Sequence, residues 1–281
     1  MESVTESAAD LKLHEPNKHL AKLQAAGVIG LLRAVRISVS PRDPSTPLQS
    51  NQCVVHLQRH GQALHNLMAD NLKALGVSLE DEKGKKSRNH PYTLPEMVDP
   101  PLTHKGRQQC KGQRGRAASI RPELVFVSPL CRAVQTALLT FPHLRGSVPF
   151  IAVEEARETL GVNTCDKRRS TSDIEAEYGH AVDFSRMQTE EDEEWRPDHR
   201  ESSHELVDRI YCFLIELREL EQNEVLLVTH SGWLLAMLAA VCDCTAHPHL
   251  AEWFETCEIR TVVLSYQDTR TDQTRLDHSL D

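Results

Sequence analysis

The chain has 281 residues, of which 40% are hydrophobic and 26% are charged, and its formal net charge at pH 7 is −9. A chain of this length and composition can bury the core of one large α/β domain, or of two small ones, without disulfides. Its acidic balance argues against a general nucleic-acid-binding protein, so that an anionic substrate would need a locally basic pocket.

The N-terminus reads MESVTESAADLKLHEP, a polar and acidic stretch that fits neither a signal peptide nor a transit peptide. No apolar run reaches the length that crosses a bilayer, so we expect no integral membrane association. The eight cysteines are scattered without a CxxC pair, which favours reduced, packed thiols over a zinc site. These features predict a cytoplasmic protein, with the nucleus as the alternative, and leave the oligomeric state unknown.

Residues 1–48 are interpreted as an N-terminal extension, partly helical or weakly ordered, ahead of a domain over residues 49–281. The pattern over residues 19–39 predicts an amphipathic helix with one apolar face, formed by Leu20, Leu23, Leu31 and Ala34. This helix could bind a partner or a membrane surface, or simply pack on the core, and Gly27 and Gly30 weaken it. The stretch PRDPSTPLQSN that follows has the composition of a linker.

From residue 53 onward, short apolar runs alternate with helix-type stretches. The runs that predict strands cover residues 53–57, 124–128, 149–153, 224–230 and 259–266. The stretches that predict helices cover residues 61–75, 103–120, 130–141, 204–220 and 233–242. Continuous apolar strands separated by helices predict a three-layer α/β/α sandwich with a mostly parallel central sheet. In such sheets the ligand lies beyond the carboxyl ends of the strands.

Two long irregular segments interrupt this alternation, over residues 78–101 and 161–203. Long loops in a compact domain are often lids or binding loops, so both are candidates for the rim of a site. The acidic run EEDEEW at residues 190–195 is interpreted as a solvated face, and a role in substrate selection is the alternative.

Charged and polar side chains follow the predicted strands at the points where the strands end. Arg59 and His60 follow the first strand, Arg132 lies in the first turn after the second, and His230 ends the fourth. The segment EEARETLG follows the third strand. Because the carboxyl ends of parallel strands share one edge, these side chains would form a positive pocket with a carboxylate beside it. Two guanidiniums and two imidazoles suit a dianionic phosphate, whose oxygens match the forked donors of arginine.

These residue types together can transfer a phosphoryl group. A neutral imidazole can attack phosphorus as a nucleophile, while the arginines and the second histidine neutralise the charge on the equatorial oxygens. A carboxylic acid is then needed to protonate the leaving alcohol, and afterwards to deprotonate water. No residue cluster has metal-ligand spacing, so we expect no metal site and no cofactor.

Four segments lie at these strand–helix junctions, namely RHGQALHN, DPPLTHKGRQQ, VSPLCRAVQTA and VTHSGWL. The first resembles the R-H-G-x-x-x-x-N signature of the histidine phosphatase superfamily, whose fold is also called phosphoglycerate-mutase-like. The others resemble, in the family's order, its L-T-x-x-G helix start, its S-x-x-x-R-A-x-Q-T-A segment and the strand end that carries its second histidine. Four matching segments in order over residues 53–266 are far more specific than one RHG.

The resemblance implies a role for each matching position. His60 corresponds to the histidine that accepts the phosphoryl group, and His230 to the second histidine, which supports that group. Arg59 and Arg132 correspond to the phosphate-binding arginines. Asn66 corresponds to a polar residue at the floor of the pocket.

The general acid and base is expected among the glutamates of EEARETLG. Many relatives place a glutamate four residues before a glycine, where this chain has Arg157, whereas Glu158 stands three residues before Gly161. We choose Glu158 and keep Glu154 and Glu155 as alternatives, because motif offsets vary by a residue.

A closer resemblance lies in RETLGVNTCDKRRS and EEDEEWRPDHRESSHELVDRIYCFL, which are similar to fungal and plant phosphoglycerate-mutase-like proteins. It implies that the CDKRR loop rims the pocket, where Arg168 or Arg169 would touch the non-reacting part of the substrate. Asp166 would orient one of these arginines, and a local salt bridge within the turn is the alternative. His65 is expected on a helix surface, with the pocket mouth as its alternative place.

Together these observations predict a metal-independent phosphomonoesterase with a small phosphorylated substrate, a phosphohistidine intermediate on His60 and Glu158 as general acid and base. A phosphoglycerate mutase is the alternative, because it uses the same site but returns the phosphoryl group to a bound product. A non-catalytic interaction module of the same fold is a third interpretation, which the retention of both histidines and both arginines disfavours. The identity of the substrate does not follow from the sequence.

Overall fold

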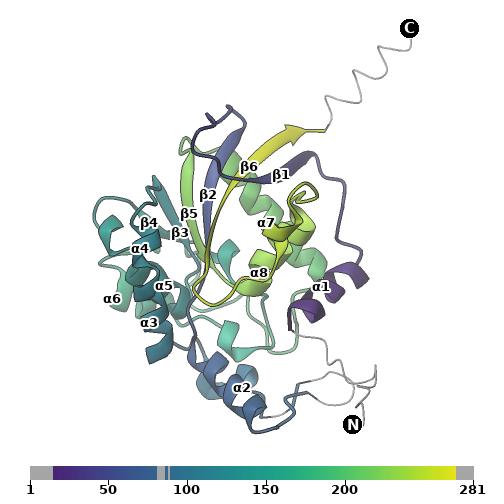
Figure 1. The fold of residues 1–281 in the computed structure, drawn as a ribbon. Helices are drawn as coiled ribbons and strands as arrows, with labels where there is room; N and C mark the ends of the chain where they lie inside the picture. The colour runs from purple at the N-terminus through teal and green to yellow at the C-terminus, as the bar shows by residue number, and fades with distance from the viewer. Residues whose placement is uncertain (1–14, 81–85, 88, 270–281) are drawn as a thin grey trace, which may run out of the picture.

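The computed structural model describes residues 15–80, 86–87 and 89–269, so that the first part of the expected extension and part of the 78–101 loop lie outside it. Its centre is a six-stranded sheet with the order β1-β6-β2-β5-β3-β4 (Figure 1). The strands are β1 Val35–Pro41, β2 Gln52–Arg59, β3 Leu124–Val127, β4 Phe150–Ala152, β5 Glu224–Thr229 and β6 Ile259–Asp268.

Four neighbouring strands of the sheet, β2, β5, β3 and β4, run parallel to one another. β6 pairs antiparallel with β2, and β1 pairs antiparallel with β6. In the parallel part, Leu57 lies opposite Leu227, which in turn lies opposite Phe126. All three side chains are buried, as is expected for strands that helices cover on both faces.

The α-helices are α1 Glu15–Ala25, α2 Leu64–Ala74, α3 His104–Gly112, α4 Arg114–Ala117, α5 Cys131–Thr140, α6 Thr171–Tyr178, α7 Ser203–Arg218 and α8 Ser231–Ala236. A π-helix continues α8 over Met237–Val241. The short 3₁₀ turns are Pro91–Thr93, Pro95–Met97, Pro142–Leu144, Glu154–Ala156, Thr164–Asp166 and Pro248–Ala251.

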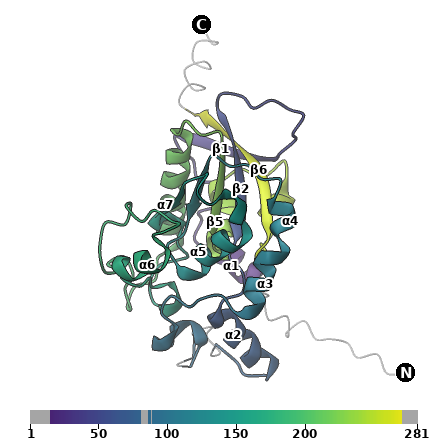
Figure 2. The same ribbon diagram turned by 90° about the vertical axis from the view of Figure 1, so that its left-hand side faces the viewer.

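The helices cover both faces of the sheet, which confirms the predicted three-layer α/β/α sandwich. On one face, α1, α7 and α8 pack over Phe126, where the ring of Phe213 stands edge-on to it with 5.4 Å between centroids. On the other face, α4, α5 and α6 pack over Val125 and Val127. In both views α2 lies beyond the end of the sheet at which the parallel strands finish (Figures 1 and 2).

Polar side chains fix where the helices begin. Ser202 and Glu205 form a capping box at the start of α7, in which each side chain accepts a hydrogen bond from the other residue's backbone N–H. The hydroxyl of Thr103 accepts from the backbone N–H of Gly106 and starts α3 within the LTHKG segment. These caps lie where the sequence changes from loop to helix, so the surrounding loops have fixed points of attachment.

The N-terminal prediction is wrong in two respects. The helix expected over residues 19–39 ends at Ala25, because Gly27 has a φ of 65° and breaks the helical path. The chain then forms β1, whose seven residues all pair with β6, and Val28 is fully buried in the main core. The boundary expected at residue 48 therefore does not divide the fold, since α1 and β1 belong to the same packed unit.

The acidic run at residues 190–195 is only partly a solvated face, because Asp192 is buried. Its carboxylate accepts hydrogen bonds from both terminal nitrogens of Arg157, at 2.9 and 2.5 Å, and from the backbone N–H of Arg168 at 2.9 Å. Glu154 joins the same cluster through Arg157 at 2.9 Å and Arg168 at 2.6 Å. This buried network ties the loop of residues 187–203 to the segment after β4.

Replacement of Asp192 by asparagine is expected to lower the free energy of unfolding by about 3–5 kcal/mol, because it leaves Arg157 buried without a full counter-charge. Burial alone would raise the pKa of Asp192, but the hydrogen bonds and charge of Arg157 outweigh it and lower the pKa below the ordinary 3.8. The contribution of the pair is thus present above that ordinary pKa and is lost as the pH falls through the depressed one. Urea denaturation of both proteins at pH 7 and at about pH 2 measures the effect, because the difference in stability should be full at pH 7 and shrink at the lower pH. Equal stability at pH 7 would contradict it.

Candidate active site

Two histidines meet at the edge where the parallel strands end. Arg59, the last residue of β2, lies opposite Thr229, the last residue of β5, so His60 and His230 leave the sheet side by side. Their ring centroids are 5.0 Å apart, with an angle of 61° between the ring planes. Both are buried, with exposed fractions of 3% and 0%.

The protonation of His60 follows from its hydrogen bond. Its Nδ1 lies 2.7 Å from the carbonyl oxygen of Gly61, which can only accept, so Nδ1 carries the hydrogen. Burial, and then the charges of Arg132 and Arg59, hold the pKa of His60 well below the ordinary 6.5. The ring is therefore neutral near pH 7, and its Nε2 has a free lone pair for attack on an electrophile.

Two guanidiniums are held beside these rings by the protein backbone. Arg132 on α5 donates from Nη1 to the carbonyl oxygen of Cys165 at 2.6 Å and from Nη2 to Asp166 at 3.0 Å. Arg59 donates from Nη1 to the carbonyl oxygen of Phe254 at 2.7 Å, and its guanidinium carbon lies 5.5 Å from the centre of the Trp253 ring. Each arginine is thus fixed from one side before any substrate arrives.

Buried nitrogens without a partner gather at this edge of the sheet. Of the described residues, only six have a buried side-chain nitrogen or oxygen that forms no hydrogen bond. Four of these atoms lie here, namely Arg59 Nε, Arg132 Nε, His65 Nδ1 and His230 Nδ1. Buried polar atoms are rarely left unsatisfied, so such a concentration of nitrogens points to an anion as the natural occupant.

The structure adds two residues to the site, namely Ser128, which had no predicted role, and His65, for which the pocket mouth was the alternative to a helix surface. His65 is only 4% exposed, and its ring lies 6.3 Å from that of His60 and edge-on to Tyr92. Ser128 directly follows β3, and its hydroxyl lies 2.8 Å from Nε2 of His230. The place of Ser128 immediately after a strand was the signal that could have found it, whereas the burial of His65 depends on the distant Tyr92.

The three candidate glutamates occupy different surroundings. The carboxylate of Glu158 accepts a hydrogen bond from the backbone N–H of Thr159 and another from that of Gly232, both at 3.0 Å. Gly232 follows His230 by two residues in the sequence, so the second hydrogen bond ties Glu158 to the segment that carries His230. The carboxylate of Glu154 is engaged by the two buried arginines described above. Glu155 accepts hydrogen bonds from Arg209 and Trp233 through its backbone carbonyl oxygen rather than through its carboxylate. Glu158 is therefore the glutamate with the closest ties to the histidines.

In a comparison with known proteins, the family described as the histidine phosphatase superfamily (branch 1) matches residues 55–277. The chain belongs to the histidine phosphatase superfamily. It is 32% identical over 243 residues to "Phosphoglycerate mutase-like protein 1" of Arabidopsis thaliana, which covers 75% of this chain and 80% of the relative. It is 29% identical over 235 residues to "Phosphomutase-like protein 3" of Candida albicans, over 81% of this chain and 70% of the relative.

Among solved structures, this histidine phosphatase superfamily member is similar to the alpha-ribazole phosphatase of Shigella flexneri. The two are 19% identical, with a TM-score of 0.47, and the match covers 77% of this chain and 96% of the other.

Two glycines of the superfamily motifs are explained by close backbone packing. A Cβ atom on Gly61 would lie 2.9 Å from the carbonyl oxygen of Gly106, and one on Gly106 would lie 2.2 Å from that of Gln62. Asn66 also serves this region, because its Oδ1 accepts from the backbone N–H of Ala63 at 3.1 Å. Its Nδ2 lies 3.4 Å from the hydroxyl of Tyr92, so the amide holds the start of α2 rather than standing free in the pocket.

The predicted substrate rim needs correction. Arg168 is only 2% exposed, and its guanidinium donates to Glu154 and to the carbonyl oxygens of residues 169 and 189–191, so it does not face a substrate. Arg169 pairs with Asp99 at 3.2 Å and with Glu177 at 2.9 Å. Asp166 orients neither of them, because its carboxylate pairs with Arg132 and with Arg200 at 3.1 Å.

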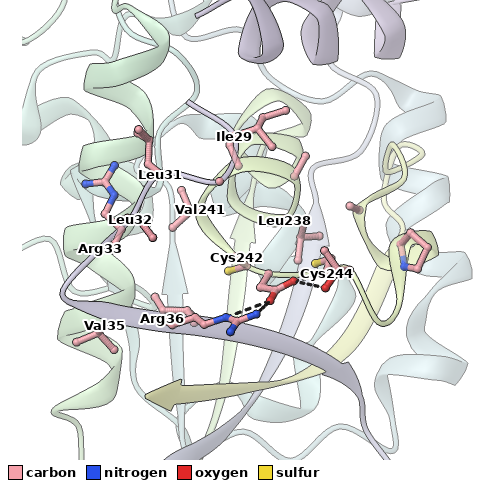
Figure 3. A pocket seen from close by; sticks show the side chains of 18 of the residues that line it. Ile29, Leu31, Leu32, Arg33, Val35, Arg36, Leu238, Val241, Cys242 and Cys244 are labelled. Atoms are coloured by element: carbon pink, nitrogen blue, oxygen red, sulfur yellow. Dashed lines mark hydrogen bonds and ion pairs between the residues drawn. The ribbon is translucent and has the colours of Figure 1, made fainter. Parts of the chain in front are cut away.

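A separate apolar pocket of about 660 Å³ lies away from the histidines (Figure 3). Its walls come from the segment between α1 and β1 and from the π-helix and the residues after it, including Ile29, Leu31, Leu238, Val241 and Cys242. Arg36 and Asp243 form an ion pair at its polar side. None of the strand-end residues described above lines it.

The described part of the chain contains no helix with the length and hydropathy of a membrane span. Within the same residues, no group of three or more His, Cys, Asp or Glu side chains has an arrangement that could hold a metal ion.

Replacement of Gly232 by alanine is expected to displace the carboxylate of Glu158 without unfolding the protein. The new Cβ would lie 2.5 Å from Glu158 Oε1, and this flexible chain end can move away where backbone could not. A displaced catalytic group of this kind lowers kcat by on the order of 100-fold. Steady-state kinetics on a phosphate ester measure the change, with Gly112→Ala as control, since nothing lies within 4 Å of a Cβ there. An unchanged kcat in Gly232→Ala would show that Glu158 takes no part in the reaction.

Proposed function

We propose that the protein is a phosphomonoesterase that hydrolyses small phosphate esters through a phosphohistidine intermediate on His60. The observation that carries the proposal is the state of this ring, which is neutral, donates through Nδ1 to Gly61 and keeps the Nε2 lone pair free beside two guanidiniums. Membership of the histidine phosphatase superfamily supports the reaction class.

In the first step, Nε2 of His60 attacks phosphorus and the bond between phosphorus and the ester oxygen breaks. Glu158, in its protonated form, gives its proton to that oxygen, so that the leaving group departs as a neutral alcohol. In the second step, the Glu158 carboxylate takes a proton from water while the water oxygen attacks phosphorus. The N–P bond breaks, inorganic phosphate is released, and Glu158 is again protonated for the next cycle.

The remaining residues stabilise charge on the transferring group. The nitrogens of Arg59, Arg132 and His230 that have no protein partner can donate to the equatorial oxygens as the ester bond breaks. Because Asp166 and the backbone hold the arginines in place, little reorganisation is needed when the substrate binds. These steps use side chains of this protein alone.

A phosphoglycerate mutase is the second candidate, because plant and fungal relatives carry mutase names. A mutase would share the first step and then transfer the phosphoryl group to a bound product instead of water. Incubation with labelled bisphosphoglycerate and unlabelled 3-phosphoglycerate tests both candidates. Released inorganic phosphate indicates the phosphatase, whereas transfer of the label to the added monophosphoglycerate without phosphate release indicates the mutase. Labelled phosphate as the main product is the expected result.

A further inference from the structure

A small pocket adjoins the glutamate that we assign as general acid. It has a volume of about 130 Å³, and its walls include Thr159 and Gly232. These are the two residues whose backbone N–H groups donate to the carboxylate of Glu158. Ligand pockets that enclose whole drug-sized molecules are about 300–1,000 Å³, so this one suits a single small group of a larger ligand.

The wall of this pocket is basic. His19 and Lys22 reach it from α1, and Arg200 from the long loop before α7. The acidic residue in the wall is Glu201, whose carboxylate is already engaged by Arg209 at 2.8 and 2.7 Å. An anionic group that enters the pocket would therefore meet positive charge without an opposing free carboxylate.

Arg200 is held in place by the same acid that holds the phosphate-binding arginine. Asp166 accepts from Arg132 on one oxygen and from Arg200 on the other, at 3.0 and 3.1 Å. The same Nη1 of Arg200 also donates to the carbonyl oxygens of Thr159 and Gly161, both at 2.7 Å. Its Nη2 and Nε donate to no acceptor among the described residues, which leaves them available to a ligand.

We propose that this pocket binds a second anionic group, a carboxylate or a phosphate, on the leaving portion of the substrate. The inference rests on the proposed phosphatase function and names its substrate class. Because Glu158 must come within hydrogen-bonding distance of the ester oxygen, the rest of the leaving alcohol has to lie next to Glu158. The basic pocket lies at that place, so it selects leaving groups that carry a negative charge.

α1 links the basic pocket to the phosphate site. α1 lies beside α8, the helix that follows His230 (Figure 1). The ring of His19 lies 5.2 Å from that of Trp253, whose other neighbour is the guanidinium of Arg59 at 5.5 Å. Lys18 pairs with Glu80 at 2.8 Å, which ties α1 to the segment after α2. α1 precedes the superfamily match at residues 55–277, so the matched segment alone does not contain this part of the pocket wall.

The test compares phosphate esters of short hydroxy acids, such as 2-phosphoglycolate and 3-phosphoglycerate, with esters of the matching hydroxy amides. Full-length wild-type protein is expected to show kcat/KM about fivefold higher for the acids, which is the upper end of what one ion pair with the exposed Lys22 contributes. Lys22→Ala is expected to reduce this ratio to about twofold, while Lys22→Arg keeps it. Higher ionic strength should lower the ratio in the wild type, which a purely structural role of Lys22 would not produce.

Lys111→Ala is the matched control, because Lys111 is an exposed lysine in the last turn of α3, on the other side of the sheet. Its ratio should equal that of the wild type. Equal rates for acids and amides in the wild type, or a full preference retained by Lys22→Ala, would overturn the basic pocket and leave the phosphatase proposal standing. Failure of the wild type to hydrolyse any ester would overturn the phosphatase proposal, and the role of the pocket with it.

Discussion

Replacement of His60 by alanine is expected to lower the hydrolysis of phosphate esters by about four to six orders of magnitude, because the variant has no nucleophile for the first step. The neighbouring His230 cannot take over, since one of its nitrogens is already engaged by Ser128 and the ring stands at a different strand end. Phosphate release from para-nitrophenyl phosphate measures the loss. A second readout is the trapping of protein-bound phosphate, which should be labile to acid and absent from the variant.

His104→Ala serves as the matched control, because it removes an exposed imidazole at the start of α3. Its activity should equal that of the wild type. If His60→Ala retained activity close to wild type, or if the wild type carried its trapped phosphate on another residue, the assignment of the nucleophile would be wrong.

Replacement of Glu158 by glutamine is expected to lower kcat by about 10²–10⁴-fold, because the amide can neither protonate the leaving oxygen nor take a proton from water. The size of the loss should depend on the substrate. An alkyl phosphate has a poor leaving group and depends fully on the acid in the first step, whereas para-nitrophenolate departs without a proton. Kinetics on both esters, with a pre-steady-state phase for the aryl ester, measure this difference.

The chain offers two matched controls for that variant within the same segment. Glu155→Gln makes the same chemical change three residues earlier and should leave kcat within about twofold, since Glu155 accepts hydrogen bonds through its backbone carbonyl oxygen rather than its carboxylate. Glu154→Gln should instead lower stability, because it weakens the pairing with Arg157 and Arg168. If Glu155→Gln lost activity and Glu158→Gln did not, Glu155 would be the general acid.

The parts of the fold and of the candidate site that could be predicted are those that depend on short, continuous segments of the sequence. The parallel strands are continuous apolar runs, and the chemical groups follow directly at their carboxyl ends, so strand and site were recognised from the same short segments. His60, His230, Arg59 and Arg132 are all of this kind. The choice of Glu158 among three glutamates stays a prediction from the order of residues, and its hydrogen bond from Gly232 supports it.

The parts that could not be predicted depend on partners far away in the chain. β1 follows an apolar stretch that suits a helix, and it is a strand only because β6, more than 200 residues later, pairs with it. Arg168 lies in a segment that resembles a pocket rim, but its guanidinium donates hydrogen bonds to carbonyl oxygens of residues more than 20 positions away in the chain. Burial of His65 likewise requires Tyr92. Sequence patterns report the periodicity of a segment and not its tertiary partners.

The pairing of β1 with β6 removes the apolar β6 from the edge of the sheet. β6 runs from Ile259 to Asp268 and carries several buried apolar side chains, and β1 satisfies the backbone groups along its outer side. A chain trimmed to the superfamily match would present that row of N–H and C=O groups to solvent. Exposed strands of this kind recruit strands from other molecules and start aggregates. In the full chain β1 becomes the edge strand opposite β4, and the backbone of Asp243 pairs with Ile37 and Val39 on its outer side. The segment before the superfamily match therefore moves the edge of the sheet from β6 to a shorter strand that is already partly paired.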